Sequence, residues 1–249
     1  MPEAAAPILA TTREPADVHG VHGAAGLTHW KCLAARRHLS GEWEAVEWAS
    51  LPPGAVSGEH RHTRTEEIYF LIRGEGELVV NGTPHPVGPG SLLLTGIGAV
   101  HGLRNTGATD LDWLVIEMPA PETTRVLRGR PAVPRSTPPK EGRHQMNARL
   151  YDLDEHGSVD PRELLTGPLS LVELIRVDPT VPHVLNSEGV EHTLFVLEGT
   201  GTAVSGDTSV PLAPGTALTL PLGGHAVVDT DSSLRCFHAV LDVAGKEAT

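Results

Sequence analysis

The chain of 249 residues repeats itself at an offset of 125 residues, and this repeat limits what the chain can fold into. Residues 69–76 (YFLIRGEG) align with residues 194–201 (LFVLEGTG), and residues 87–90 (VGPG) align with residues 212–215 (LAPG). Matching glycines and prolines indicate matching turns, because both residue types are selected for their backbone geometry. The repeat therefore predicts two copies of one module, each of about 100 residues.

Each copy has the pattern of short strands joined by tight turns. Residues 68–72 form an apolar run that is typical of a strand buried on both faces. Asn81 and Gly82 separate two extended runs and predict a type I′ hairpin, which needs positive φ at both central residues. Modules of this kind usually close into a barrel or sandwich that hides their strand edges. We therefore expect an all-β fold, in keeping with 27 glycines and 21 prolines.

Composition divides the chain into four parts. We expect an N-terminal extension over residues 1–39, a first module over 40–120 and a second module over 151–249. The intervening residues 121–150 are rich in proline and arginine, which favours an extended linker. Asp160 followed by Pro161 predicts a short helix over residues 160–165, with the aspartate as its N-cap.

Four residues of the first module have spacings that suit a metal site. His60 and His62 are two residues apart, so they would point to the same side of an extended strand. Glu67 begins the next strand, where a carboxylate is costly to bury unless it binds a positive group. His101 lies on a later strand that can pass beside the first pair in a rolled sheet. Imidazole nitrogens with a carboxylate suit Fe, Mn, Ni, Cu or Zn, whereas the alternative is metal-free histidines at the surface or in the core.

These spacings also carry a resemblance to the cupin superfamily. The first cupin motif is matched at every defining position by Gly54-x5-His60-x-His62-x4-Glu67-x6-Gly74. The second motif is resembled by Gly90-x5-Gly96-x-Gly98-x2-His101-x3-Asn105, with Gly96 where the family usually has proline. With the repeat included, the chain resembles a bicupin over about residues 40–120 and 165–242.

The resemblance implies two tandem double-stranded β-helix (jelly-roll) barrels. It also implies a substrate pocket at the barrel mouth and, often, a homodimer. The metal ligands that it implies are His60, His62, Glu67 and His101.

The second copy departs from the motif. At the ligand positions the same offset places Leu185, Ser187, His192 and Ala226. Leucine and alanine cannot bind a metal, so the standard site is lost. Three nearby histidines offer a possible shifted second site: His183, His192 and His225. The alternatives are a barrel that buttresses the first or supplies a dimer face, and a metal-free ligand pocket.

Other aromatic and histidine residues are candidates for lesser roles. Tyr69 shares a strand face with Glu67, so its hydroxyl would either reach a metal-bound substrate or only line the barrel. Trp43 and Trp48 are expected in the core or at an interface rather than against a substrate. The extension carries three histidines that would either cap the barrel mouth or, as we expect, lie in a flexible tail: His19, His22 and His29.

Composition excludes some classes of function. A formal net charge of −12 and only 4% aromatic residues disfavour a nucleic-acid partner. No apolar run approaches the roughly 20 residues of a membrane-spanning helix. Cys32 and Cys236 do not make a disulfide framework, and the first residues lack an apolar signal region, so a cytoplasmic location is expected.

The expected function is that of a metal-dependent enzyme acting on a small organic molecule. Four protein ligands would leave two open positions on one divalent transition metal per chain, available to water, dioxygen or a chelating substrate. We expect Fe(II) and a dioxygenase, with Mn, Ni, Zn and Cu as alternative metals. A redox-neutral isomerase, cyclase or lyase and a non-catalytic binding or sensing bicupin are the alternative functions.

Overall fold

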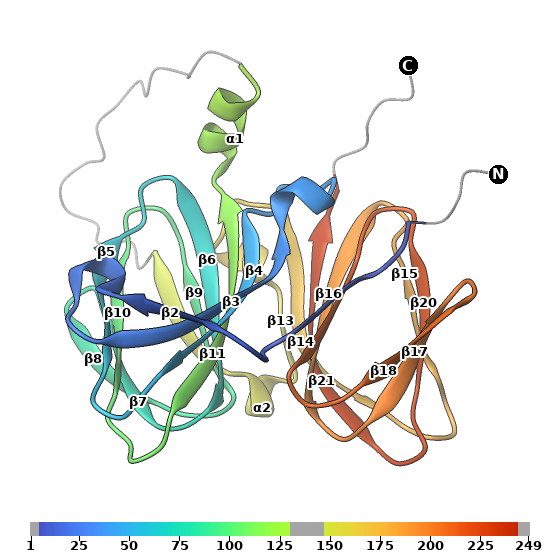
Figure 1. The fold of residues 1–249 in the computed structure, drawn as a ribbon. Helices are drawn as coiled ribbons and strands as arrows, with labels where there is room; N and C mark the ends of the chain where they lie inside the picture. The colour runs from blue at the N-terminus through green and yellow to red at the C-terminus, as the bar shows by residue number, and fades with distance from the viewer. Residues whose placement is uncertain (1–4, 130–146, 244–249) are drawn as a thin grey trace.

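The structure, a computed structural model, describes residues 5–129 and 147–243 and contains two β-barrels that lie side by side (Figure 1). Both barrels are built from antiparallel strands, and each combines one large sheet with one four-stranded sheet. The all-β fold of two tandem jelly-roll barrels is therefore confirmed. Among the described residues, no helix has the length and apolar character needed to span a membrane.

Barrel 1 is formed mainly by the first half of the chain. Its strands are β2 (Ala16–His19), β3 (Leu27–Ala35), β4 (Ala45–Leu51), β5 (Val56–Arg61), β6 (Thr65–Arg73), β7 (Gly76–Val80), β8 (Thr83–Val87), β9 (Ser91–Thr95), β10 (Val100–Asn105), β11 (Leu111–Pro119) and β12 (Ala148–Asp152). The seven-stranded sheet has the order β12-β9-β6-β11-β4-β3-β2, and the four-stranded sheet has the order β5-β10-β7-β8.

Barrel 2 repeats this plan with slightly fewer strands. Its strands are β1 (Ile8–Thr11), β13 (Ser158–Val159), β14 (Leu169–Val177), β15 (His183–Asn186), β16 (Val190–Glu198), β17 (Gly201–Ser205), β18 (Thr208–Leu212), β19 (Thr216–Leu220), β20 (His225–Asp229) and β21 (Leu234–Asp242). The six-stranded sheet has the order β1-β19-β16-β21-β14-β13, and the four-stranded sheet has the order β15-β20-β17-β18. Short helical elements are α1 (Pro121–Leu127), α2 (Leu153–His156), η1 (Val21–Gly23), η2 (Arg36–His38) and η3 (Pro161–Glu163).

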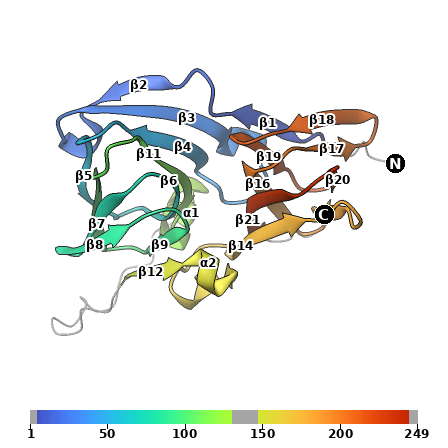
Figure 2. The same ribbon diagram turned by 90° about the horizontal axis from the view of Figure 1, so that it is seen from below.

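Segments outside the expected module limits supply strands to both barrels. From residues 1–39, β1 pairs with β19 of barrel 2, whereas β2 and β3 extend the large sheet of barrel 1 (Figure 2). From the end of the expected linker, β12 pairs with β9 of barrel 1. Each added strand covers a sheet edge whose backbone groups would otherwise lack partners. Most of the expected linker, residues 130–146, lies outside the described residues.

Two local turn predictions can be compared directly with the structure. Asn81 and Gly82 have φ of 50° and 80° and connect β7 to β8, so the type I′ hairpin is confirmed. The Asp160 carboxylate accepts a hydrogen bond from the backbone N–H of Arg162, as expected of an N-cap. The helix that it caps is only the single 3-10 turn η3, shorter than predicted.

Alternate residues of β6 enter two different cores. Tyr69 and Leu71 lie in the core inside barrel 1, whereas Ile68 and Phe70 lie in a core that includes residues of both barrels. In this interface core the rings of Phe70 and Phe237 have centroids 4.7 Å apart. The strand is apolar on both faces because one face fills barrel 1 and the other packs against barrel 2. The interface core also contains the two tryptophans expected there, Trp43 and Trp48.

A fully buried carboxylate, Glu191 of β16, also joins the barrels. It accepts hydrogen bonds of 2.8–3.0 Å from the backbone N–H groups of Ser40, Gly41 and Leu222 and from Trp43 Nε1. Three of these four donors belong to the loop that leads into β4 of barrel 1. The buried charge is therefore fully hydrogen-bonded, as a buried carboxylate must be.

Glu66 of β6 makes the reciprocal connection from barrel 1. It occupies the position that the repeat aligns with Glu191, and it is also buried. Its carboxylate accepts hydrogen bonds of 2.7–3.1 Å from the backbone and hydroxyl of Thr166 and from the backbone N–H of Gly167, just before β14. Each barrel thus holds the equivalent loop of the other through one carboxylate.

Candidate metal centre

The four residues of the predicted metal site lie together inside barrel 1. His60 is on β5, His62 follows that strand directly, Glu67 is on β6 and His101 is on β10. Because β5 and β10 pair antiparallel, His101 lies directly opposite His60. One nitrogen or oxygen atom from each of the four residues lies within 4.8 Å of the others.

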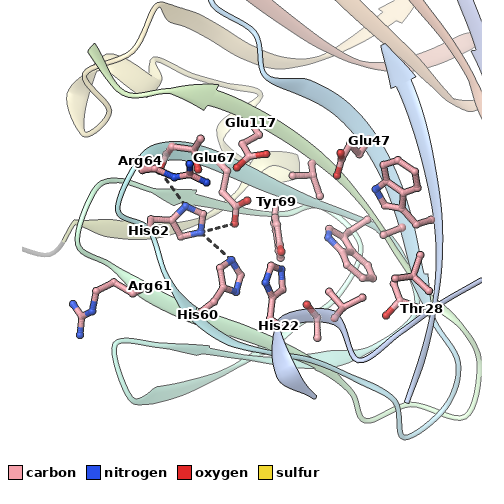
Figure 3. A pocket seen from close by; sticks show the side chains of 18 of the residues that line it. His22, Thr28, Glu47, His60, Arg61, His62, Arg64, Glu67, Tyr69 and Glu117 are labelled. Carbon is pink, nitrogen blue, oxygen red and sulfur yellow. Dashed lines mark hydrogen bonds and ion pairs between the residues drawn. The ribbon is translucent and has the colours of Figure 1, made fainter. Parts of the chain in front are cut away.

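The ligand atoms face one another at close range, and Figure 3 shows three of the four residues, His60, His62 and Glu67. Nε2 of His62 lies 3.1 Å from Nε2 of both His60 and His101, and the latter two nitrogens are 3.3 Å apart. Oε1 of Glu67 lies 3.1 Å from Nε2 of His62 and 2.5 Å from Nε2 of His101. Two nitrogens that bind one ion at about 2.1 Å, at right angles, are about 3 Å apart. The observed separations fit ligands of a common cation.

Backbone carbonyls set the tautomers of two of these rings. Nδ1 of His60 lies 3.1 Å from the carbonyl oxygen of Gly58, and Nδ1 of His62 lies 3.1 Å from that of Thr65. A carbonyl oxygen only accepts hydrogen bonds, so each neutral ring carries its proton on Nδ1. The Nε2 lone pairs are then free to bind a metal, and the carbonyl contacts orient the rings.

The resulting cluster of acceptor atoms fits a divalent metal ion. Oε1 of Glu67 is buried and has no hydrogen-bond donor among the described residues. Lone pairs that converge on a buried carboxylate oxygen are unfavourable unless a positive charge lies between them. Three imidazoles and one carboxylate are a donor set for first-row transition metals.

Burial and mutual contact shift the pKa values within the cluster. Burial, with contributions from His101 and His22, lowers the pKa of His60 to about 4. Burial alone would raise the pKa of Glu67, but His101 and His62 outweigh it and hold this pKa far below its ordinary value. Burial also acts to lower the pKa of His62, but the neighbouring carboxylate of Glu67 leaves it above its ordinary value. At neutral pH, Glu67 is ionised and His60 is a neutral ligand.

The cluster opens onto a cavity of about 490 Å³ inside barrel 1. Two of its carboxylates, Glu47 and Glu117, lie outside the ligand set (Figure 3). The ring of Tyr69 lies beside the cluster, with its centroid 4.7 Å from that of His101, and burial raises the pKa of Tyr69 well above its ordinary value. Tyr69 therefore lies where a molecule bound at the cluster would contact it, and its catalytic role stays a prediction.

His22 reaches the mouth of this cavity from the N-terminal segment. Its ring stacks on that of His60, with centroids 3.5 Å apart and planes 10° apart. A Cβ atom at Gly58 would lie 2.3 Å from the carbonyl oxygen of His22, so glycine allows this close approach. His19 and His29 lie on the paired strands β2 and β3. The expected flexible tail is therefore wrong for these histidines, because sheet pairing orders the segment.

The structure does not bring the three histidines of the possible second site together. Among the described residues, barrel 1 holds the one group of three or more potential metal-binding side chains, and none lies in barrel 2. His225 is exposed on β20, because Ala226 takes the inward position and successive strand side chains alternate. His183 and His192 thus lack their proposed third partner.

The interior of barrel 2 instead contains a chain of hydrogen-bonded groups. Nδ1 of His192 lies 3.0 Å from Nε2 of His238, and Nδ1 of His238 lies 2.9 Å from Oε1 of Glu173. Nε2 of His192 lies 3.2 Å from the carbonyl oxygen of Asn186. His238 was not expected here, although it lies opposite Glu173 in the register of β14 and β21.

The two jelly-roll barrels and the site of three histidines and one glutamate define a bicupin, and sequence comparison shows that the chain belongs to the cupin superfamily. The cupin domain family matches residues 47–117. The oxalate-binding protein of Thermotoga maritima is 30% identical over 102 residues, which cover 41% of this chain and 84% of that protein.

Solved structures extend the likeness over both barrels. Protein Ylba from E. coli has a TM-score of 0.72 and 13% identity, over 99% of this chain and 95% of that one. Salicylate 1,2-dioxygenase from Pseudoaminobacter salicylatoxidans has a TM-score of 0.67 and 17% identity, over 97% of this chain and 82% of that one. At these identities the likeness shows the two-barrel fold alone.

Proposed function

We propose that this chain is a metal-dependent enzyme that acts on a small organic molecule in the cavity of barrel 1. The observation that supports it is the convergence of three imidazole Nε2 atoms and Oε1 of Glu67 at the wall of that cavity. A volume of about 490 Å³ is suited to a small ligand. A divalent metal held by His60, His62, Glu67 and His101 would supply Lewis-acid or redox chemistry.

Other residues of the chain would position the bound molecule. Tyr69, whose pKa is raised, keeps its hydroxyl proton at neutral pH and can donate a hydrogen bond to the ligand. His22 covers His60 at the mouth and narrows the access of water to the ligand set. Trp113 adds an aromatic wall.

Within this class, we propose an Fe(II)-dependent dioxygenase. Histidines with a carboxylate and open coordination positions are the donor set of non-haem iron oxygenases. The test is anaerobic purification, metal analysis and oxygen-electrode measurement with a panel of small hydroxy, amino and carboxylic acids. One iron per chain and substrate-dependent oxygen uptake are expected, whereas turnover without oxygen uptake would contradict the oxygenase.

A redox-neutral isomerase, cyclase or lyase is the second candidate. The observation that favours it is the pair of half-buried carboxyl groups of Glu47 and Glu117, whose pKa values are raised by burial. A raised pKa favours the protonated carboxyl group, which can donate a proton to a bound molecule. Turnover at an unchanged oxygen concentration, with manganese, nickel or zinc as the metal, would identify this class.

A non-catalytic binding protein is the third candidate, favoured by the name of the Thermotoga relative. Retention of a small molecule through purification, without turnover of any panel compound, would support it. Light scattering on the same sample gives the mass in solution, and a mass of two chains is expected for the proposed homodimer.

A further inference from the structure

The cavity of barrel 1 carries an excess of acidic side chains. Besides the ligand Glu67, the half-buried Glu47 and Glu117 line it (Figure 3). The two arginines of its lining, Arg61 and Arg64, are exposed. Arg61 donates a hydrogen bond to the carbonyl oxygen of Gly98 at 2.6 Å, and its side chain points away from the ligand cluster. Arg61 therefore does not compensate the acidic interior, and Arg64 lies at the ligand end, beside Glu67 and away from Glu47.

The two additional carboxylates occupy different places. Glu117 lies opposite Glu67 in the register of β11 and β6, and it is hydrogen-bonded to Thr65. Glu47 lies on β4, on the far side of Tyr69 from Glu67 (Figure 3). The site thus has a ligand end with one nearby carboxylate and a distant end with another.

The charges of the ligand end balance without Glu47. A divalent metal with three neutral imidazoles and ionised Glu67 carries one net positive charge, and Glu117 can compensate it. Glu47 receives a hydrogen bond from Trp30 but has no ion-pair partner among the described residues. A half-buried carboxylate without a cation is costly, and a second anion beside it would raise the cost further.

The spacing of the strands sets the length of molecule that would reach both ends. Strand β4 is separated from β6 by β11, which is two strand spacings, or about 10 Å between backbones. Glu47 is in register with Val115 and Tyr69, two residues along the sheet from the register of Glu67, so the two backbones are about 12 Å apart. The side chains of Glu47 and Glu67 both line the cavity and shorten this gap, so a short molecule can contact both ends.

We infer that the barrel 1 site takes a small molecule with an oxygen ligand for the metal at one end and a protonated amine for Glu47 at the other. The inference rests on the proposed metal site and specifies the class of its substrate. It also means that the site discriminates against dicarboxylates, although the Thermotoga relative is named for oxalate.

Three probes with short carbon chains test this inference on the full chain loaded with Mn²⁺. Butanoate, 4-aminobutanoate and glutarate each offer one carboxylate to the metal and end in a methyl, an ammonium and a carboxylate group. Their binding is followed by the change in water-proton relaxation as they displace water from Mn²⁺. We expect 4-aminobutanoate to bind about 10-fold more tightly than butanoate, and glutarate to bind more weakly than butanoate.

Substitution of Glu47 tests whether its carboxylate causes the preference for 4-aminobutanoate. Glu47→Gln keeps the size of the side chain and should abolish the preference for 4-aminobutanoate over butanoate. Glu59→Gln, an exposed position on β5, is the matched control and should retain the preference.

The possible failures are distinguishable. If glutarate binds the unsubstituted protein as tightly as butanoate or more tightly, this inference alone is overturned. The same holds if the preference for 4-aminobutanoate over butanoate survives in Glu47→Gln. A preference that is lost in Glu117→Gln instead would also overturn the assignment to Glu47. Failure of the chain to bind Mn²⁺ at all would overturn the proposed function, and the inference with it.

Discussion

The two barrels share one plan but satisfy their polar interiors in different ways. Where barrel 1 has Glu67, the repeat gives barrel 2 His192. Val115 of barrel 1 lies opposite Tyr69, and the residue that lies opposite the equivalent Leu194 in barrel 2 is His238. In barrel 1 the acceptor atoms converge on a point that suits a cation. In barrel 2 the imidazoles contact one another and a carboxylate in a linear chain.

In barrel 2, one additional proton can supply the positive charge that a metal ion would supply in barrel 1. The contacts of His192 and His238 with Asn186, with Glu173 and with each other need three N–H groups, whereas two neutral imidazoles carry two. All three hydrogen bonds form when the pair holds one extra proton, balanced by the Glu173 carboxylate. These three hydrogen bonds can therefore be satisfied by side chains and one proton, whereas the buried Nε2 of His183 has no hydrogen-bond partner among the described residues.

The largest expected effect separates the barrels by metal content. His62→Ala removes one of the converging nitrogens and should lower metal affinity by more than about 100-fold, so the purified variant should lack metal. His192→Ala should leave metal content unchanged, because its ring contacts no ligand cluster. Elemental analysis of both variants decides, and loss of half the metal in His192→Ala would contradict the metal-free second barrel.

The reciprocal carboxylates allow a test of whether the barrels depend on each other. Glu191→Ala leaves four hydrogen-bond donors, one of them the buried Trp43 Nε1, without an acceptor, and it should reduce the free energy of unfolding by about 3 kcal/mol. Glu188→Ala, at an exposed position three residues earlier, should change it by less than about 0.5 kcal/mol. Urea unfolding measures both, and equal effects would show that the buried carboxylate contributes little.

Acid should weaken metal binding, and this effect should come from a ligand of barrel 1 and not from the histidines of barrel 2. The pKa of His62 lies above its ordinary value of 6.5, so metal binding must release this proton, and affinity should fall about tenfold per pH unit below that pKa. His60, with a pKa of about 4, stays neutral in this range. Calorimetric titration with Mn²⁺ from pH 7.5 to 5.5 measures the slope. The slope should be the same in His192→Ala, and a flat profile would contradict the assignment of His62.

The smallest expected effect concerns His22 at the mouth of barrel 1. His22→Ala removes the ring that stacks on His60, so release of Mn²⁺ to a chelator should become several-fold faster. His19→Ala changes an exposed histidine of the same segment and should leave the rate unchanged. Stopped-flow measurement gives both rates, and identical values would show that His22 does not cover the site.

The sequence predicted the ligand set and one hairpin turn from patterns of neighbouring residues. The ligand set follows from spacing, because His60, His62 and Glu67 lie within eight residues on adjoining strands. The turn at Asn81 and Gly82 follows from backbone conformation alone. Both features depend on a few neighbouring residues, so the sequence shows them directly.

Long-range contacts were not accessible in the same way. The stacking of His22 on His60 depends on the path of a segment some 40 residues away, which no periodicity encodes. Which histidine points into barrel 2, His238 or His225, depends on which face of its strand is inward, and a shift of one residue reverses that face. The equivalence of Glu66 and Glu191 lay within the repeat, but only the structure shows the loops that they bind.

The pairing of β1 with β19 has a consequence for the order in which the protein is made. Ile8 of β1 pairs with Thr219, so β1 leaves the ribosome about 200 residues before its partner strand is made. An unfinished polypeptide keeps that strand unpaired and open to proteolysis. The order of synthesis therefore delays the closure of this sheet edge until β19 has been made.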